Sequence, residues 1–528
     1  MAQYEETLLL GDCLDHFAKV SPDHVVVECR GKSYTYAAFA AAVDKCAHAM
    51  YANGLRKGSC VAVLSAQRIE ILTTFFAAAR LGILWLGVNP KYQLREMRHV
   101  IGDSKPTMLF GIESLDGRDY GPDIDSLRSE YPNIEKFIGF DGTGAYDTGF
   151  ESWVNSDFCA DDEAGYKEVV NSVTDKTDGM LIYTSGSSGK PKGVLLPQKA
   201  ILKRALIQRD YFPVDPYPVL LCPLPITHVG GIIVLPLFTI VSGGKVILTE
   251  RFSPDEFIEA MINDKINMVG AVPAMHMMLM QHPKFSMELY QKLDWILWSG
   301  AKMSEDMVEI LYNSKCNLGS TYGTTESSAS VTFATINDSS VEVMSKTIGK
   351  PGPNGEVRIA NDETVCAAGD TGELQIRPEY SMTGYLNNQQ ATKAAFTKDG
   401  WYKTGDIGNM RKDGNIEFTS RISEMFVSGG ENIYPLEIEQ TLDSHPDIIM
   451  SAVIDIDDEV FEQVGWAYIM AKPGTELNDE KLKHWCRGEM VNYKIPKRFI
   501  FMFPLPMLPI GKIDKVSLKK MALEELEE

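Results

Sequence analysis

The sequence gathers glycine, hydroxyl and lysine side chains in one short loop, a combination suited to phosphate binding. The loop runs Thr184-Ser185-Gly186-Ser187-Ser188-Gly189-Lys190-Pro191-Lys192 and follows the apolar segment 180–183. Glycine lets the backbone approach a ligand closely, hydroxyl and amide groups donate hydrogen bonds to phosphate oxygens, and Lys192 adds positive charge. A flexible linker is the alternative interpretation, but two lysines framed by Pro191 and Gly193 are not typical of a linker. The loop therefore predicts polyphosphate chemistry.

This loop differs from the P-loop of kinases and GTPases, which has the pattern G-x-x-x-x-G-K-[ST]. Ahead of Gly189-Lys190, the position of the first glycine is held by Thr184. Pro191 stands where a serine or threonine would coordinate magnesium. We therefore expect a different kind of nucleotide site.

Three further polar residues are candidates whose types alone do not decide their roles. Asp406 has the surroundings of a turn residue, Lys512 those of a solvated loop lysine, and His228 taken alone favours a core position. The adjacent segment 229–231, Val-Gly-Gly, adds weight to a functional His228. The methionine-rich segment 275–280 predicts an adaptable core helix rather than a metal or cofactor site.

Alternating helical and strand-like patterns indicate the elements that position these residues. Segments 36–50 and 69–81 have helical spacing of apolar residues, and segment 59–64 between them resembles a buried strand. Similar short apolar runs recur at 180–183, 219–222, 245–248 and 295–298. This alternation predicts an α/β fold in which helices cover the faces of a parallel sheet.

The sequence pattern changes after about residue 350, where short strands punctuated by glycine and aspartate predict antiparallel pairing. A final block predicts a small α+β module. Its elements are a helix at 436–442, strands at 449–456 and 466–471, and a helix at 481–490. We therefore expect two domains, 1–421 and 422–528, with the boundary near residues 421–424.

Composition and charge exclude several classes of protein. The 528 residues are 44% hydrophobic and 23% charged, as in globular rather than disordered or fibrous chains. With 51 basic and 72 acidic residues, the net charge of −21 opposes non-specific binding to nucleic acid or an anionic membrane.

Nine cysteines without a C-x-x-C pair predict a reducing compartment and no structural zinc. The longest apolar stretch, 231–241, contains Pro236 and is too short to span a bilayer, so we expect a cytoplasmic protein without stable membrane insertion.

Seven further motifs follow the phosphate loop in a recognisable order. They lie at 223–231, 298–302, 322–326 (Tyr-Gly-Thr-Thr-Glu), 372–374, 402–406, Arg421 with 428–433, and 509–513. Together with the loop, they resemble the AMP-forming adenylating superfamily. That superfamily contains acyl- and aryl-CoA synthetases, the adenylation domains of peptide synthetases, and luciferases.

The resemblance implies a fold and a reaction. The implied fold is a large N-terminal domain of parallel and mixed sheets flanked by helices, with a small distorted β-barrel, followed by a small mobile α+β C-terminal domain. The implied reaction uses ATP and Mg²⁺ to convert a carboxylic acid to an acyl-adenylate with release of pyrophosphate. The acyl group is then transferred to CoA, giving acyl-CoA and AMP, as the C-terminal domain alternates between two positions.

The resemblance also assigns the catalytic residues. The loop from Thr184 to Lys192 holds the β- and γ-phosphates of ATP, and Glu326 binds Mg²⁺ together with Thr184. Lys512 reaches the α-phosphate and the acyl oxygens from the C-terminal domain. His228 lies at the substrate carboxylate. Such a transfer depends on positioning and on neutralising negative charge, which these cations and Mg²⁺ would supply.

Larger sets are implied for the nucleotide, the acid and CoA. Asp406 accepts hydrogen bonds from the ribose beside Arg421, and Tyr322 lies near the adenine. The remaining adenine-site residues are Gly300, Ala301, Lys302, Thr321, Gly323, Thr324 and Thr325. The acyl pocket comprises His228, Val229, Gly230, Ile233, Trp298, Ser299, Lys302, Thr324 and Ser327. The CoA tunnel contains Ser428, Gly429 and Gly430, which arrive by rotation about a hinge at Ser423.

The sequence departs from the family's pattern at four positions. Ser423 replaces the usual hinge aspartate or lysine, Thr227 replaces an aromatic residue before His228, and Gln198 replaces a frequent histidine. Lys302 stands where small residues or proline are common. It could pair with a polar group of the substrate, although a solvated lysine before a helix is the simpler interpretation.

Two alternatives to a CoA ligase are considered. An adenylating enzyme that loads the phosphopantetheine arm of a carrier protein would use the same motifs, and the basic segment 492–498 does not separate the two. A non-enzymatic sensor on a ligase scaffold is disfavoured because Lys512, Glu326, Asp406 and Arg421 are all present. The sequence leaves open the acid and the oligomeric state, for which a homodimer is a common arrangement.

Overall fold

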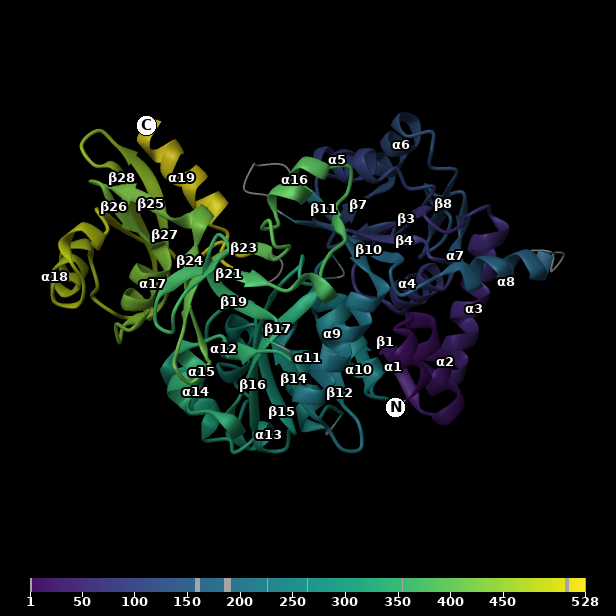
Figure 1. The fold of residues 1–528 in the computed structure, drawn as a ribbon, viewed down its shortest axis with the longest axis horizontal. Coiled ribbons are helices and arrows are strands. Elements are labelled where there is room, and N and C mark those ends of the chain that lie inside the picture. Colours follow the sequence, from purple (N-terminus) through teal and green to yellow (C-terminus); the bar gives the residue numbers. More distant parts are fainter. Residues whose placement is uncertain are drawn as a thin grey trace.

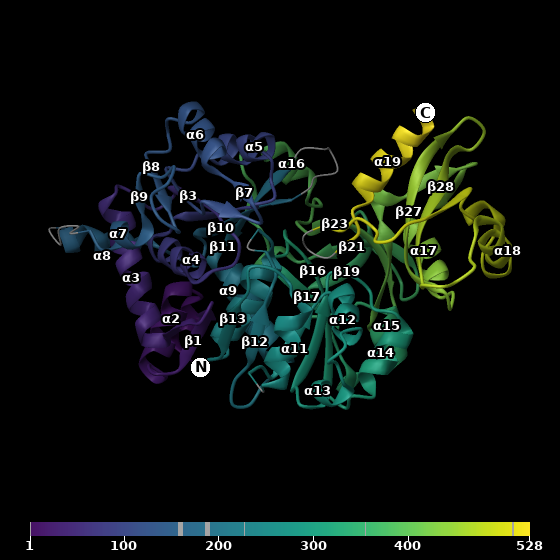
Figure 2. The ribbon, with the colours of Figure 1, turned by 180° about the vertical axis from the view of Figure 1, so that it is seen from behind.

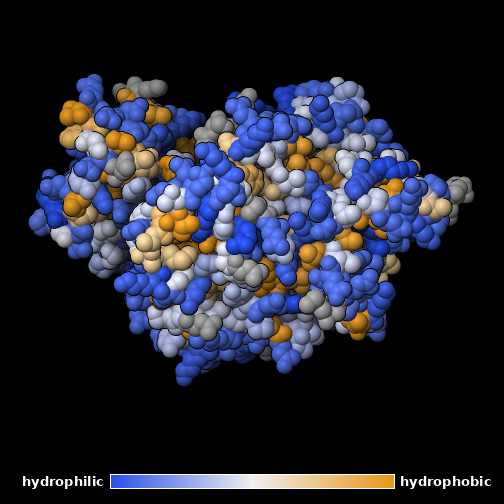
Figure 3. Space-filling model, viewed as in Figure 1, coloured by the Kyte–Doolittle hydropathy of each residue, from blue (hydrophilic) through white to orange (hydrophobic). Residues whose placement is uncertain are grey.

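The computed structural model describes residues 2–156, 162–184, 191–225, 227–263, 265–353, 355–508 and 512–527. Two sheet-containing lobes lie side by side, and the last elements of the chain stand apart from them at one end (Figures 1 and 2). The face seen in Figure 3 is mostly hydrophilic, with apolar side chains in scattered groups. Among the described residues, no helix combines the length and the apolar character needed to cross a membrane.

The first lobe is built on a nine-stranded sheet with the order β18-β17-β16-β15-β14-β12-β13-β1-β2. The central strands run parallel from β1 to β16, and β2, β17 and β18 add antiparallel edges. The strands are β1 (Val25–Cys29), β2 (Lys32–Thr35), β12 (Val219–Cys222), β13 (Lys245–Leu248), β14 (Met268–Ala271), β15 (Trp295–Ser299), β16 (Asn317–Thr324), β17 (Ala329–Thr335) and β18 (Lys350–Pro351).

An eight-stranded sheet forms the second lobe, with the order β22-β11-β10-β4-β3-β5-β8-β9. It is parallel from β10 to β9, whereas β11 and β22 pair antiparallel. Its strands are β3 (Cys60–Leu64), β4 (Leu84–Val88), β5 (Met108–Gly111), β8 (Lys136–Gly139), β9 (Thr148–Gly149), β10 (Asp178–Thr184), β11 (Lys192–Pro197) and β22 (Gly384–Tyr385). A separate short ribbon pairs β6 (Ser114–Leu115) with β7 (Arg118–Asp119).

Helices of the first 400 residues pack against these sheets. Helix α4 (Ile69–Leu81) is buried on nearly all sides, because its sequence is apolar around its full circumference, and it ends at Gly82 in a left-handed conformation (φ 67°). The other helices are α1 (Gln3–Thr7), α2 (Leu10–Val20), α3 (Tyr36–Ala52), α5 (Leu94–Ser104), α6 (Gly121–Glu130), α7 (Phe150–Val154), α8 (Glu163–Ser172), α9 (Gln198–Tyr211), α10 (Phe238–Val241), α11 (Pro254–Ile262), α12 (Pro273–Met280), α13 (Met287–Gln291), α14 (Glu305–Tyr312), α15 (Val341–Lys346) and α16 (Gln389–Ala394).

A five-stranded antiparallel sheet occupies the place of the expected β-barrel, with the order β20-β19-β21-β23-β24. Its strands are β19 (Val357–Asn361), β20 (Thr364–Val365), β21 (Thr371–Ile376), β23 (Tyr402–Met410) and β24 (Ile416–Arg421). The short 3₁₀ turn η5 (Ile422–Glu424) follows β24 and leads to the C-terminal elements. The expected change to antiparallel strands after about residue 350 is therefore confirmed.

The C-terminal elements form their own sheet and their own core. The sheet contains β25 (Phe426–Ser428), β26 (Glu431–Ile433), β27 (Ile448–Asp458), β28 (Glu462–Ala471) and β29 (Arg498–Phe501), and its helices are α17 (Pro435–Asp443), α18 (Asp479–Glu489) and α19 (Lys515–Glu527). Two apolar clusters consist only of residues from Phe426 onward. The α/β class and the predicted helices and strands of this block are confirmed. The domain boundary at 421/422 stays a prediction, which the separate cores support.

Candidate active site

The parallel sheets explain why distant motifs meet. Strands β12, β14, β15 and β16 run in the same direction, so the segments that follow them emerge at one edge of the sheet. The segment with His228 follows β12, the Gly300 loop follows β15, and the Tyr-Gly-Thr-Thr-Glu motif lies at the end of β16. The sheet edge therefore gathers motifs that are about 100 residues apart in the sequence.

The two ends of the phosphate loop are joined by a β-hairpin. Thr184 at the end of β10 pairs with Lys192 at the start of β11. The loop residues predicted to contact phosphate between them, Ser185, Gly186, Ser187, Ser188, Gly189 and Lys190, lie outside the described residues. Antiparallel pairing places the two ends of the loop, Thr184 and Lys192, next to each other.

Helix α5 fixes both sides of this loop. The Tyr183 hydroxyl donates to Asp103 Oδ2 at 2.8 Å, and His99 Nε2 donates to the Pro191 carbonyl at 2.9 Å. Asp103 and His99 lie one helical turn apart on α5, so one face of the helix holds the entry and the exit of the loop. Sequence reasoning did not identify either residue, because both supports come from an element about 80 residues upstream.

Tyr385 joins Lys192, a predicted phosphate-binding residue, to Glu326, the predicted Mg²⁺ ligand. Strand β22 pairs with β11, which brings Tyr385 beside the phosphate loop. The Tyr385 hydroxyl donates to Glu326 Oε1 at 3.1 Å, and Lys192 Nζ lies 5.2 Å from the centre of the Tyr385 ring. Sequence reasoning missed Tyr385 because no local pattern in its segment points to phosphate.

Asp406 lies at the centre of the predicted ribose site. Its Oδ2 accepts a hydrogen bond from the Tyr322 hydroxyl at 2.5 Å, and its Oδ1 lies 3.0 Å from Arg421 Nε. The side chain is 1% exposed, yet Oδ1 accepts no hydrogen bond of good geometry within the described residues. Burial raises the pKa of Asp406, whereas Arg421, Tyr322 and Lys512 oppose this shift. A buried carboxylate oxygen that has an ion-pair partner but no well-aligned hydrogen bond fits a sugar hydroxyl from a bound nucleotide.

Lys512 reaches this cluster from the C-terminal part of the chain. Its Cε lies 3.7 Å from the position that a Cβ atom on Gly300 would occupy. Burial lowers the pKa of Lys512, and the positive charge of Arg421 adds to the effect. The negative charge of Asp406 also acts on Lys512. The Lys512 ammonium therefore lies among the groups predicted to surround the ribose and the α-phosphate.

His228 is held in one tautomer by the backbone. Its Nδ1 accepts a hydrogen bond from the Gly230 N–H at 3.0 Å, so the proton of the neutral ring is on Nε2 and can be donated to a ligand. Desolvation lowers the pKa of His228 to about 4, with a further contribution from Lys512. Gln67 Nε2 donates to the carbonyls of Leu224 and Gly231, at 2.5 and 3.0 Å, and so fixes the segment around the imidazole.

The titration of His228 provides a test of this geometry. Replacement of Lys512 by methionine is expected to raise the pKa of His228 from about 4 toward its ordinary value of 6.5, because a neighbouring positive charge is removed. The shift should be incomplete because desolvation is the larger cause. The chemical shift of the His228 Cε1 proton, measured by NMR as a function of pH, reports the change. An unchanged titration in the variant would show that Lys512 is not close to the imidazole in solution.

The predicted acyl-pocket residues flank these groups. Val229, Gly230, Ile233, Trp298 and Ser327 are buried, and Ser299 and Thr324 are partly exposed. Gly230 begins the π-helical segment η2 (Gly230–Leu237), a type of turn found often at functional sites. Ser299 Oγ donates to the Thr321 carbonyl at 2.9 Å, which links the ends of β15 and β16.

The adenine-site loop after Ser299 is exposed at Gly300, Ala301 and Lys302. Gly300 lies beside Lys512 with φ at 84°. The charged neighbours of Lys302 include Glu417, Lys346 and Arg411. These contacts do not connect Lys302 to Asp406 or to Lys512, so a role for Lys302 in the substrate pocket stays a prediction.

The remaining adenine-site residues follow Ser320 on β16 and in the turn after it. Thr321 and Thr325 are buried, and Gly323 has no room for a side chain, because a Cβ atom there would lie 1.8 Å from the Ala329 carbonyl oxygen. The Thr321 hydroxyl is buried without a hydrogen-bond partner among the described residues. Thr321 Oγ1 and Asp406 Oδ1 are thus two buried polar atoms without a hydrogen bond from the described residues.

The predicted CoA-tunnel residues lie in the C-terminal sheet. Ser428 pairs with Glu462, and the Gly429 N–H donates to the Phe461 carbonyl at 2.9 Å. Gly429 and Gly430 both have positive φ, 60° and 83°, which forms the tight turn between β25 and β26. In this structure the active-site cluster receives Lys512, and the turn at 428–430 contacts its own sheet.

The predicted hinge is bounded by two anchored residues. Arg421 pairs with Asp406 on the N-terminal side. On the C-terminal side, Lys515 Nζ lies 2.8 Å from both Glu424 Oε2 and Glu439 Oε1, which ties Glu424 to the C-terminal core. Ile422 and Ser423 are the residues between these anchors, and rotation would have to be absorbed there.

Gln198, the substitution for a frequent histidine, has a structural role. Its Nε2 donates to the Ala79 carbonyl at 2.7 Å and its Oε1 accepts from the Leu10 N–H at 3.1 Å. The side chain is buried and joins three helices, α2, α4 and α9. This position therefore contributes to packing.

The residues present fit the predicted Mg²⁺ and ATP. Within the described residues, no group of three His, Cys, Asp or Glu side chains forms a complete metal site. Mg²⁺ commonly combines one or two carboxylates with substrate phosphates, so Glu326 next to the phosphate loop suits a metal that arrives with ATP.

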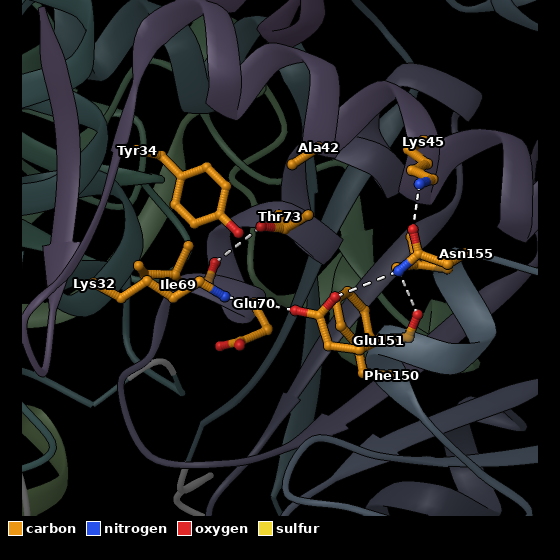
Figure 4. A pocket seen from close by; sticks show the side chains of 11 residues that line it. Lys32, Tyr34, Ala42, Lys45, Ile69, Glu70, Thr73, Phe150, Glu151 and Asn155 are labelled. Carbon is orange, nitrogen blue, oxygen red and sulfur yellow. Dashed lines mark hydrogen bonds and ion pairs between the residues drawn. The ribbon is translucent and has the colours of Figure 1, made fainter.

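A cavity of about 160 Å³ lies elsewhere, between α3, α4, α7 and β2 (Figure 4). Its polar groups pair with one another: Lys32 lies 3.5 Å from Glu151, and Lys45 donates to Asn155. The cavity contains none of the motif residues, and its polar groups have partners, so the sheet edge remains the candidate active site.

Comparison with known proteins agrees with this assignment. The family model of the AMP-binding enzymes matches residues 14–386, and that of the AMP-binding enzyme C-terminal domain matches residues 437–512. The indoleacetate–CoA ligase of Aromatoleum aromaticum is 29% identical, covering 97% of this chain and 98% of its own. The long-chain-fatty-acid–CoA ligase FadD13 of Mycobacterium tuberculosis is 27% identical, covering 92% of each chain. The ATP-bound crystal structure of MatB from Rhodopseudomonas palustris superposes with a TM-score of 0.82 at 23% identity, covering 96% of this chain and 98% of that one.

The matched segments contain the phosphate loop, the Tyr-Gly-Thr-Thr-Glu motif and Lys512, which are features of the candidate site described above. The chain therefore belongs to the AMP-binding enzymes of the AMP-forming adenylating superfamily, and it is most like their CoA ligases.

Proposed function

We propose that this enzyme activates a carboxylic acid with ATP and then transfers the acyl group to CoA. In the first step, a carboxylate oxygen forms a bond to the α-phosphorus and the bond to the pyrophosphate leaving group breaks. In the second step, the CoA sulfur bonds to the acyl carbon, the bond to AMP breaks, and the thiol proton is released. The main support is the presence of Lys512 beside Gly300 and among His228, Asp406 and Arg421.

Each group has a chemical task in the first step. Asp406 Oδ1 accepts a hydrogen bond from a ribose hydroxyl, and Lys512 and Arg421 neutralise charge that spreads over the α-phosphate. His228 Nε2–H donates to the acid and orients it for attack. Glu326 would hold Mg²⁺, which neutralises the phosphate oxygens when it is bound with ATP.

The second step is proposed to follow rotation of residues 422–528 about Ser423. Rotation removes Lys512 and brings the turn at Ser428–Gly430 to the acyl-adenylate, so one acyl site serves both steps. Arg421 and Glu424 are each held by an ion pair on either side of Ser423, which supports rotation at this hinge.

The structure gives no added support to a carrier protein as the acceptor. Acidic carriers would require free basic side chains on the C-terminal domain. In segment 492–498, Lys494 lies 2.7 Å from Glu437 and Arg498 pairs with Glu525. Two of its cations are therefore already neutralised within the domain.

The decisive experiment is a screen of pyrophosphate release with short, medium, long, aromatic and dicarboxylic acids, each with and without CoA. We expect ATP- and acid-dependent pyrophosphate release for one class, and AMP with an acyl-CoA thioester when CoA is added. Turnover that needs a carrier protein and ignores CoA would contradict the proposal, as would the absence of pyrophosphate release with every acid. The screen also selects among the acid classes, which a pocket distinguishes by about 1–3 kcal/mol per methylene group.

A further inference from the structure

The chain contains a fully buried ion pair next to the active site. Arg204 on α9 has a side chain that is 1% exposed, and its Nη1 lies 2.5 Å from Glu356 Oε2, with Glu356 6% exposed. Buried guanidinium groups are rare, because desolvation of the charge is unfavourable unless each donor finds an acceptor. The position of Arg204 therefore requires an explanation beyond packing.

The other contacts of Arg204 lead to Glu326. Its Nε donates to the Ser327 carbonyl at 3.0 Å and to the Tyr380 carbonyl at 3.2 Å. Ser327 follows Glu326 directly in the sequence. One guanidinium thus holds the turn that contains Glu326 and joins it to the segment at Tyr380.

The segment after Tyr380 holds Glu326 from the other side. The Met382 N–H donates to the Glu326 carbonyl at 2.7 Å, and the Tyr385 hydroxyl donates to Glu326 Oε1 at 3.1 Å. Arg204 therefore binds a carbonyl on each of the two segments whose separation fixes the Glu326 carboxylate. Loss of the guanidinium would remove one of the links between these segments and leave the Met382 and Tyr385 hydrogen bonds to hold Glu326.

The turn itself has a backbone that needs such support. Ser328 and Ala329 follow with φ of 62° and 117°, values that residues other than glycine seldom adopt. Strained residues persist where the surrounding contacts determine them, and they occur often at ligand sites. Ser327 Oγ supplies one restraint, since it donates toward the carbonyls of Thr324 and Ala329 at 2.9 and 2.7 Å. Arg204 supplies the restraint from outside the turn.

We propose that Arg204, neutralised by Glu356, is a positioning residue that fixes Glu326 for the binding of Mg²⁺ with ATP. This inference rests on the proposed role of Glu326 as a metal ligand. A lysine could not replace Arg204 fully, because the planar guanidinium reaches Glu356 and two carbonyls at the same time.

The test compares Arg204→Met, Arg204→Lys and the double variant Arg204→Met with Glu356→Met. Calorimetry measures the dissociation constant of ATP with Mg²⁺ and in EDTA, and a thermal melt of the free protein measures stability. We expect Arg204→Met to weaken binding of ATP with Mg²⁺ by about 10–100-fold, the range seen when residues that orient metal ligands are removed, while binding in EDTA changes little. Arg204→Lys should lie between this variant and the wild type.

The double variant separates position from stability. Apolar side chains of similar volume can replace a buried ion pair without loss of stability, so its melting temperature should recover. Its affinity for ATP with Mg²⁺ should remain weak, because the carbonyls of Ser327 and Tyr380 still lack their donor. If the double variant recovers both the melting temperature and the affinity for ATP with Mg²⁺, the inference is overturned, since Arg204 would then contribute to stability alone.

A matched control uses another largely buried arginine. Arg80 pairs with Asp15 at 2.7 Å, is 15% exposed, and lies between α2 and α4 away from Glu326. Arg80→Met should lower the melting temperature and leave both dissociation constants unchanged.

Glu326→Gln separates this inference from the proposed function. If Glu326→Gln leaves the Mg²⁺ dependence of ATP binding unchanged, the proposed metal role fails. If Glu326→Gln weakens the binding but the Arg204 variants do not, only the positioning role fails.

Discussion

Replacement of Lys512 by alanine is expected to reduce acid-dependent pyrophosphate release by about 10²–10³-fold, the range for loss of one preorganised electrostatic contact. Formation of the thioester from a supplied acyl-adenylate should change by less than about threefold, because that interaction is absent from the second transition state. Lys512 would thus act in one half-reaction only.

The expected loss of pyrophosphate release follows from the position of the Lys512 ammonium group. Lys512 lies beside Gly300 and close to Asp406, Arg421 and His228, within a region where burial lowers the pKa of the lysine itself. A charge in a partly desolvated site interacts more strongly with developing negative charge than a charge in water. Once the adenylate has formed, the rotated domain would carry Lys512 away.

The measurement separates the two half-reactions. Pyrophosphate release is followed with acid and ATP alone, and thioester formation is followed with synthetic acyl-adenylate and CoA. Lys520→Ala serves as the control, since Lys520 lies on the same C-terminal segment but is 78% exposed. An equal loss in both half-reactions of Lys512→Ala would contradict the assigned role.

Much of the fold could be predicted because its determinants are local. The helical spacing at 36–50 and 69–81 and the apolar run at 59–64 correspond to α3, α4 and β3. Parallel pairing of such strands places the segments after them at one edge. The motif residues Asp406 and Tyr322, 84 positions apart, could be assigned to one site only through the resemblance to the adenylating superfamily, and the structure joins them by a hydrogen bond.

The supports of the site could not be predicted, because they depend on long-range contacts of ordinary residue types. Tyr385 reaches Glu326 across 59 positions, Gln67 reaches Leu224 across 157, and Arg204 reaches Glu356 across 152. No spacing rule connects such pairs. For Lys302, a solvated lysine before a helix is the simpler prediction from the sequence, and the structure shows this side chain exposed.

The hinge provides the second large effect. Ser423→Pro is expected to leave adenylation nearly intact and to reduce transfer to CoA by about 100-fold, since a catalytic group displaced by even about 1 Å loses that much rate. Proline fixes φ near −65°, a value compatible with the 3₁₀ turn at Ile422–Glu424, so we expect the conformation seen here to be retained. The change in φ that rotation requires is blocked.

The two anchors explain why this residue should be decisive. Arg421 is held by Asp406, and Glu424 is held by Lys515, so backbone rotation concentrates at Ile422 and Ser423. Ser423→Ala is the matched control, because it removes the hydroxyl and keeps φ free; both half-reactions should then be normal. A thermal melt of both variants verifies that the fold is unchanged. If Ser423→Pro still forms acyl-CoA at the wild-type rate, rotation about this residue is not part of the reaction.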